Sequence, residues 1–114
     1  MLKKVDHIVA GNPMTISEHL AAARDLIKDP SGWTQGFFAR DKSGNEVSVR
    51  DPSAVCFCAS GAISRIPSSA SRDRVFRCLE EQMNGYIPKF NDSHSHAEVL
   101  AAFDRAIAES EVEA

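Results

Sequence analysis

The sequence predicts a mainly α-helical chain, with about four helices and a small β-hairpin that packs on a central helix. Two patterns carry this prediction. Apolar residues recur at helical spacing in four segments, and one segment between the first two alternates apolar with polar residues. The length of 114 residues gives room for one core, and we expect a single helical domain over residues 15–108. A hydrophobic content of 43% is too high for a disordered chain, and no apolar run is long enough to span a membrane.

The first helix is expected to follow an N-terminal lead-in of residues 1–14. Thr15 and Glu18 fit a capping box, in which each side chain accepts a hydrogen bond from the other residue's unpaired backbone N–H. An apolar stripe at helical spacing runs from there to Ile27. The helix should end shortly before Pro30, because proline cannot continue a helix at that point.

A β-hairpin is expected at about residues 33–49. In its first half, Trp33 and Gln35 fall on one side of an alternating pattern. A glycine-bearing loop follows at residues 41–45, and a short run at residues 46–49 completes the pattern. Because an isolated hairpin is only marginally stable in water, it should lie against the helices.

The second helix is expected to begin with Asp51 as N-cap and Pro52 at the first helical position, and to end at Pro67. On that helix, Phe57 and Gly61 would lie together, nearly opposite the main apolar stripe. Glycine costs about 1 kcal/mol relative to alanine within a helix. We therefore expect another element, the hairpin, to approach this helix closely at Gly61.

Two further helices complete the prediction. The third carries the stripe from Val75 to Met83, and Gly85 suits its C-terminal cap. Residues 86–94 are interpreted as irregular. The fourth helix begins with a second capping box, formed by Ser95 and Glu98, and presents its apolar face to the core.

An acidic tail of residues 109–114 is expected to stay solvated and frayed. The formal net charge is −3, and the tail accounts for it with three glutamates, which leaves 13 acids against 13 bases in the preceding residues. A neutral body argues against non-specific binding of nucleic acid. A basic group on the second and third helices would be the only candidate for such binding, and it consists of Arg65, Arg72, Arg74 and Arg77.

The cysteines indicate the compartment. Three are present, Cys56, Cys58 and Cys78, and an odd number without an export signal points to a reducing cytoplasm. On a helix, Cys56 and Cys58 would point in nearly opposite directions and could not hold one metal ion together. We interpret both as small buried hydrophobic residues.

The segment of residues 91–96, which carries two histidines and an aspartate, resembles a metal site in composition. Asp92, His94 and His96 are possible ligands, but the same residue types form turns and helix caps, and the spacing matches no established metal motif. We expect capping here, with no metal and no cofactor. The sequence also lacks a glycine-rich phosphate loop and the common nucleophile and zinc-protease motifs, so nothing indicates an enzyme.

Several segments nevertheless occur in a recognisable order. They are W-x-Q-G at 33–36, A-R-D at 39–41, D-P at 51–52, F-C-x-x-G-A at 57–62, N-D at 91–92 and E-V-L-A-A-F-D-R-A-I at 98–107. Together they resemble a family of small uncharacterised bacterial proteins, a domain of unknown function, over about residues 15–108. The chain departs from the family pattern at Phe90, where tryptophan is usual, and at His94 and His96, which argues further against a metal site.

The resemblance implies no activity, substrate or cofactor. It implies only that certain residues belong to a shared pattern, and core and cap positions would explain most of them. These residues are Gln35, Gly36, Phe57, Cys58, Gly61, Asn91 and Asp92.

Two hypotheses about function remain. The first is a small cytoplasmic, non-enzymatic interaction or accessory protein, with self-association as one form of it. The second is a binding site for a small molecule or metal, with enzymatic activity as one option, in a polar pocket between the hairpin and the loop before the last helix. It requires Cys58 and Asp92 to lie within about 10–12 Å of each other. Its candidate residues are Gln35, Arg40, Cys58, Asn91 and Asp92, with Arg40 as the anion contact.

Overall fold

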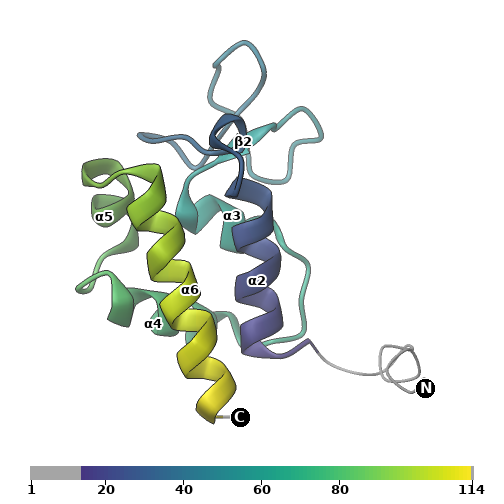
Figure 1. The fold of residues 1–114 in the computed structure, drawn as a ribbon. Helices are drawn as coiled ribbons and strands as arrows, with labels where there is room; N and C mark the ends of the chain where they lie inside the picture. Colours follow the sequence, from purple (N-terminus) through teal and green to yellow (C-terminus); the bar gives the residue numbers. More distant parts are fainter. Residues whose placement is uncertain (1–13, 114) are drawn as a thin grey trace.

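Five α-helices and a two-stranded antiparallel sheet make up residues 14–113, which are the part of the chain that the computed structural model describes (Figure 1). Nearly all of the predicted lead-in lies outside these residues. The mainly helical class and the small hairpin packed on helices are confirmed. The elements in order are α2 (Ile16–Ile27), a 3₁₀ turn η1 (Pro30–Gly32), β1 (Ala39–Arg40), β2 (Cys56–Phe57), α3 (Ala59–Arg65), α4 (Arg72–Gln82), α5 (Ile87–Ser93) and α6 (His96–Glu113).

The core lies between α2, α3, α4 and α6. Helices α2 and α6 run side by side, with β2 and the loops at one end of them and the C-terminus at the other (Figure 1). Both predicted capping boxes are present. The backbone N–H of Glu18 donates to Thr15 Oγ1 at 3.1 Å, and that of Thr15 donates to Glu18 Oε1 at 2.9 Å. None of the described helices is long and apolar enough to cross a membrane. Fully buried apolar side chains fill the core, among them Leu20, Ile27, Ile63, Val75, Leu79, Val99 and Phe103.

The strand pairing differs from the hairpin predicted at residues 33–49. Ala39 pairs with Phe57 and Arg40 with Cys56, so the strand partner comes from beyond residue 49. Only an isolated bridge between Arg40 and Glu46 closes the predicted turn. Because both strands are very short, the sequence pattern contains little information about which segment pairs with β1.

The second helix is shorter than predicted, because α3 starts at Ala59 and not at Pro52. The expected N-cap, Asp51, instead closes a local turn: its Oδ1 accepts the backbone N–H and the hydroxyl of Ser53, both at 2.8 Å. Residues 56–57 are consequently free to form β2, and Phe57 is buried in the sheet and not on a helix face.

The close approach predicted at Gly61 is confirmed. A Cβ added there would overlap the backbone carbonyl of Phe38. That carbonyl also accepts the N–H of Cys58 at 3.2 Å. The loop that leads into β1 therefore lies directly on the first turn of α3, and only glycine leaves room for it.

Two C-terminal predictions are wrong. Residues 87–93, interpreted as irregular, form α5, which has a proline in its first turn and buries Ile87 and Asn91. Helix α6 does not end at residue 108 but continues to Glu113, so the expected frayed tail is helical. Ser110 is buried there, and its hydroxyl donates to the carbonyl of Ile107 at 2.9 Å. Neither glycine nor proline interrupts the segment, so the helix has no local reason to stop earlier.

Candidate functional site

Asn91 joins three segments that are far apart in the sequence. It belongs to α5 and is 0% exposed. Its Oδ1 accepts two hydrogen bonds, one from Trp33 Nε1 at 2.8 Å and one from the N–H of Ala59 at 3.0 Å. Its Nδ2 donates to the carbonyl of Thr34 at 3.1 Å. The side chain thus fixes the loop after η1 and the start of α3 onto α5, which is a structural use of its polar atoms.

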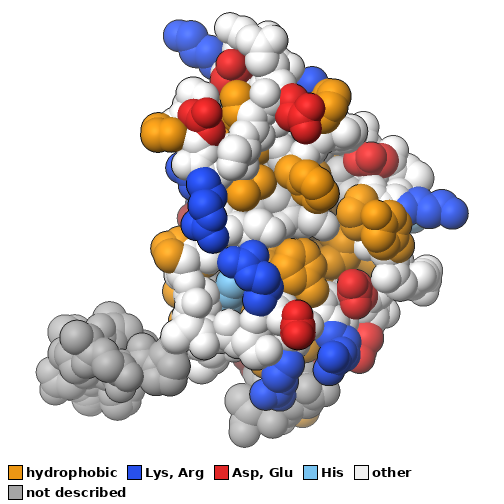
Figure 2. Space-filling view, turned by 180° about the vertical axis from the view of Figure 1, so that it is seen from behind, with side chains coloured by type: hydrophobic (Ala, Val, Ile, Leu, Met, Phe, Trp, Pro, Cys, Tyr) orange, Lys and Arg blue, Asp and Glu red, His pale blue; other side chains and the backbone are white. Residues whose placement is uncertain are grey.

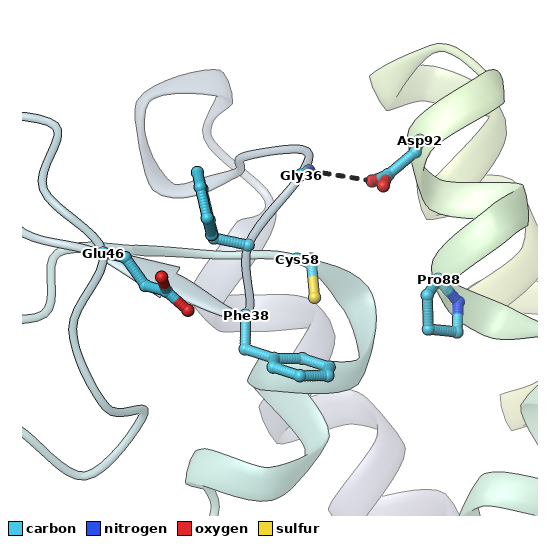
Figure 3. A pocket seen from close by; sticks show the side chains of 7 residues that line it. Gly36, Phe38, Glu46, Cys58, Pro88 and Asp92 are labelled. Atoms are coloured by element: carbon cyan, nitrogen blue, oxygen red, sulfur yellow. Dashed lines mark hydrogen bonds between the residues drawn. The ribbon is translucent and has the colours of Figure 1, made fainter.

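Gln35 and Asp92 extend this network. Gln35 Nε2 donates to the backbone carbonyls of Asn91 at 2.9 Å and of His94 at 3.3 Å. Asp92 Oδ1 accepts the backbone N–H of Gly36 at 3.0 Å (Figure 3). Gly36 has a φ of +89°, which glycine adopts without strain. These contacts attach the part of the loop that precedes Phe37 in the sequence to α5.

The side chain of Arg40 donates hydrogen bonds to the same loop and does not face an anion site. Its Nε donates to Thr34 Oγ1 at 2.8 Å, and its two terminal nitrogens donate to the carbonyls of Gly44 at 3.0 Å and of Gln35 at 3.1 Å. Its Cζ lies 4.3 Å from the centroid of the Phe37 ring. Because three backbone or hydroxyl acceptors already hold the guanidinium, it is poorly placed to bind an added anion.

Cys58 is the N-cap of α3, a role that the sequence did not suggest. It is only 4% exposed, and its Sγ accepts the N–H of Gly61 at 3.3 Å. Burial raises the pKa of the thiol, the N–H groups of Gly61 and Ser60 partly oppose this, and the charge of Asp92 raises the pKa further. The thiol therefore stays neutral near pH 7, which makes it a weak nucleophile.

A pocket of about 130 Å³ lies between the loop before β1 and helix α5. Of the five candidate residues, Cys58 and Asp92 line it, and Gln35, Arg40 and Asn91 do not. The side chains of Phe38 and Pro88 enclose the sulfur of Cys58, and Asp92 lies above Pro88 on the same helix (Figure 3). The lining consists of Gly36, Phe37, Phe38, Glu46, Cys58, Pro88 and Asp92.

Sequence reasoning missed the residues most prominent at this pocket. Phe37 is 40% exposed and Phe38 is 53% exposed, whereas the alternating pattern at about residues 33–49 predicts that they lie on opposite sides of a strand. On the face that Figure 2 shows, hydrophobic side chains gather, and both acidic and basic side chains lie around them. The two adjacent phenylalanines after a glycine are the one sequence signal of this feature, since two neighbours in a strand cannot both face the core.

The histidines of residues 91–96 make structural contacts. One ring nitrogen of His94 lies 2.9 Å from the carbonyl of Phe90, and its ring stacks on that phenyl ring with the centroids 3.6 Å apart. His96 Nε2 lies 2.6 Å from the carbonyl of Ile27. Within residues 14–113, no group of three or more histidine, cysteine, aspartate or glutamate side chains is arranged to hold a metal ion.

Comparison with known proteins identifies the family but not a function. Residues 11–109 match the model of a family of unknown function (DUF6197), and the chain belongs to that family. No curated protein and no solved structure matches the chain.

Proposed function

We propose that this member of the family is a small, non-enzymatic interaction or accessory protein of the bacterial cytoplasm. It would bind a partner protein through Phe37, Phe38 and the pocket beside them, which we call the phenyl surface. The observation that carries the proposal is the exposure of two adjacent phenyl rings on a loop whose backbone is held on both sides.

The loop presents these rings in a fixed position. Before Phe37, the N–H of Gly36 donates to Asp92; after it, the carbonyl of Phe38 accepts the N–H of Cys58 and rests on Gly61. Exposed aromatic side chains in a rigid setting are typical of the residues that dominate binding energy at protein interfaces. Because the loop is already ordered, a partner would lose little conformational entropy of this chain on binding.

The alternative of a small-molecule site or an enzyme has less support. The pocket of about 130 Å³ is smaller than the roughly 300–1,000 Å³ typical of small-molecule sites. The side chain of Asn91 binds backbone groups and the indole N–H of Trp33, Gln35 Nε2 binds backbone carbonyls, and the thiol of Cys58 is neutral. What remains is a small recess between the exposed loop and α5, which suits a side chain of a partner protein.

The cytoplasmic location rests on cysteine usage. An odd number of cysteines is unusual in secreted proteins, where thiols pair as disulfides, and is ordinary in reducing compartments.

Affinity purification from the source organism tests the proposal. The full-length chain carries an affinity tag and is compared with the variants Phe38→Ser and Val112→Ser. Val112 is 86% exposed near the C-terminus, at the opposite end of α6 from the loops, so it is a matched control for losing an exposed apolar side chain (Figure 1).

We expect a partner that is recovered with the wild type and with Val112→Ser, and that is reduced by about tenfold or more with Phe38→Ser, as for a central interface residue. Circular dichroism of each variant confirms that it is folded. Recovery of the same proteins by all three chains, or of none by the wild type, would overturn the proposal.

A further inference from the structure

Among the described residues that line the pocket of the phenyl surface, the charged ones are acidic. They are Glu46 and Asp92; Cys58 is neutral, and no lysine, arginine or histidine of residues 14–113 is in the lining. The two carboxylates lie on opposite sides of Phe38 and Cys58 (Figure 3). A binding partner would therefore meet an acidic group at either end of an apolar recess.

Neither carboxylate is neutralised within the described residues. The ion pairs found there join Arg24 to Asp104 and Lys28 to Asp25. Both hydrogen bonds to Asp92, from Gly36 N and Asn91 Nδ2, end on Oδ1, which leaves Oδ2 available as an acceptor.

The side chain of Glu46 makes fewer hydrogen bonds to the described residues than that of Asp92 does. Its side chain makes no hydrogen bond or ion pair to any residue of the described chain, and the residue is exposed. The neighbouring guanidinium of Arg40 is held by the carbonyls of Gly44 and Gln35 and by the hydroxyl of Thr34. Among the described residues, it makes no ion pair with either acid of the pocket.

The aromatic rings also favour a positively charged group. The guanidinium of Arg40 covers the ring of Phe37, whereas no cation from the described part of the chain lies over the ring of Phe38. A ring face next to carboxylates attracts a cation, and guanidinium stacks on such faces better than ammonium does. The recess also continues past Phe38 and Glu46 to a second hollow, lined in addition by residues 47–49.

We propose that the phenyl surface receives a short segment of a partner protein in which a basic side chain, arginine above all, stands beside apolar ones. The apolar side chains would pack on Phe38 and Pro88, and the guanidinium would pair with Asp92 or Glu46. The idea rests on the proposed function and adds the chemistry of the partner to it, through charge complementarity with the pocket.

Blocked tripeptides provide a direct test with the full-length protein. The probes carry arginine, lysine, norleucine or glutamate between two leucines, and binding is followed through the backbone amide resonances of Gly36 and Asp92 in NMR spectra. We expect binding in the order arginine, lysine, norleucine, glutamate. The arginine peptide should bind about fivefold or more tightly than the norleucine peptide, and high salt should remove most of that difference.

Two charge-neutralising variants identify the carboxylates. Glu46→Gln and Asp92→Asn each keep the size of the side chain, and asparagine keeps an oxygen for the N–H of Gly36. Each should weaken binding of the arginine peptide about two- to fivefold and leave the norleucine peptide unchanged. Asp73→Asn, an exposed acid on α4, is the control and should change neither.

Several results would overturn this inference. Equal binding of the arginine and norleucine peptides would do so, as would no binding of any peptide or preference for glutamate. Movement of the same resonances with protein concentration would identify a second copy as the occupant, and movement on replacing Lys3 and Lys4 by alanine would identify the chain's own N-terminal segment. A partner that depends on Phe38 but not on Glu46 or Asp92 would refute the basic segment and keep the proposed function.

Discussion

The indole N–H of Trp33 donates a 2.8 Å hydrogen bond to the side-chain oxygen of Asn91, which lies 58 positions later in the sequence. The same oxygen accepts the N–H of Ala59, so one amide oxygen satisfies a part-buried and a buried donor from separate segments. The loop that carries Phe37 and Phe38 begins at this junction. Its shape is therefore set by a buried polar contact and not by a strand ladder, which is only two residues long.

Replacing Asn91 should be among the most destabilising single changes. Asn91→Ala leaves the indole N–H of Trp33, the N–H of Ala59 and the carbonyl of Thr34 without their partner in a buried site. At roughly 1–3 kcal/mol for each group, with partial relaxation, we expect a loss of about 3 kcal/mol or more in the free energy of unfolding.

Urea denaturation measures this loss. Asn45→Ala is the matched control, because Asn45 is exposed and its side-chain contact to Asp41 is 3.4 Å long; we expect it to change stability by less than about 0.5 kcal/mol. Similar effects of the two substitutions would show that Asn91 does not hold the loop.

Adding one methyl group at Gly61 should disturb the same loop from below. Alanine is about 1 kcal/mol better than glycine within a helix, yet its Cβ would overlap the backbone carbonyl of Phe38, which cannot rotate away. We expect Gly61→Ala to reduce the free energy of unfolding by about 2 kcal/mol or more and to shift the amide resonances of the loop.

Gly44→Ala is the control that distinguishes steric overlap at Gly61 from backbone strain at a glycine with positive φ. Gly44 has a φ of +88° and no atom within 4 Å of an added Cβ, so only the conformational cost of about 1 kcal/mol applies. A stability of Gly61→Ala equal to or above that of the wild type would contradict the close approach.

The extent to which this fold could be predicted depends on how local its signals are. Capping boxes and apolar stripes act over a few residues, and the helices that start at Ile16 and His96 begin where those signals place them. The start of α3 could not be placed in this way. Asp51 and Pro52 have the local chemistry of a helix start, but a turn uses the carboxylate, and a buried thiol, not an ordinary cap residue, caps the helix at Cys58.

The site was predictable in part for the same reason. The predicted residues Cys58 and Asp92 line one pocket, whereas Arg40 and Asn91 bind backbone and side-chain groups of the protein itself. The partners of Asn91 in other segments lie 32 to 58 residues away, and those of Arg40 lie four to six residues away. The type of a side chain does not reveal which of these groups will occupy it. The alternating pattern does not predict the exposure of Phe38, because that exposure depends on the distant contacts that hold the backbone on either side of it, Gly36 to Asp92 and Phe38 to Cys58.

Stability in acid should depend on the second capping box. The backbone N–H of Ser95, which Glu98 accepts at 2.8 Å, holds the pKa of that carboxyl below its ordinary value of 4.5. Because the pKa is lower in the folded state, the stabilisation is complete above about pH 4.5 and is lost as the pH falls through the folded-state pKa. Glu98→Gln should therefore lower stability near neutral pH, and its difference from the wild type should shrink in acid.

Thermal unfolding between about pH 7 and pH 3 checks this, across the range in which carboxylates titrate. Glu81→Gln, an exposed acid on α4 for which no such hydrogen bond is found, should follow the wild type at every pH. A difference between wild type and Glu98→Gln that stays constant with pH would show that the charge of Glu98 plays no part in the cap.

Stability in alkali should depend on Cys58. Burial raises the pKa of its thiol above the ordinary 9.0, so the folded state retains a proton that the unfolded chain releases more easily. The stabilisation is therefore complete below about pH 9 and is lost as the pH rises through the folded-state pKa. Serine can also cap a helix but does not ionise here, so Cys58→Ser should lose less stability than the wild type above pH 9.

Cys56→Ser, at a partly exposed thiol that caps no helix, is the control and should keep the wild-type decline. Alkylation by iodoacetamide gives an independent measure, since Cys58 should react much more slowly than Cys56 in the folded chain. Equal alkylation rates, or parallel alkaline declines for all three proteins, would mean that the thiol of Cys58 is neither buried nor held neutral.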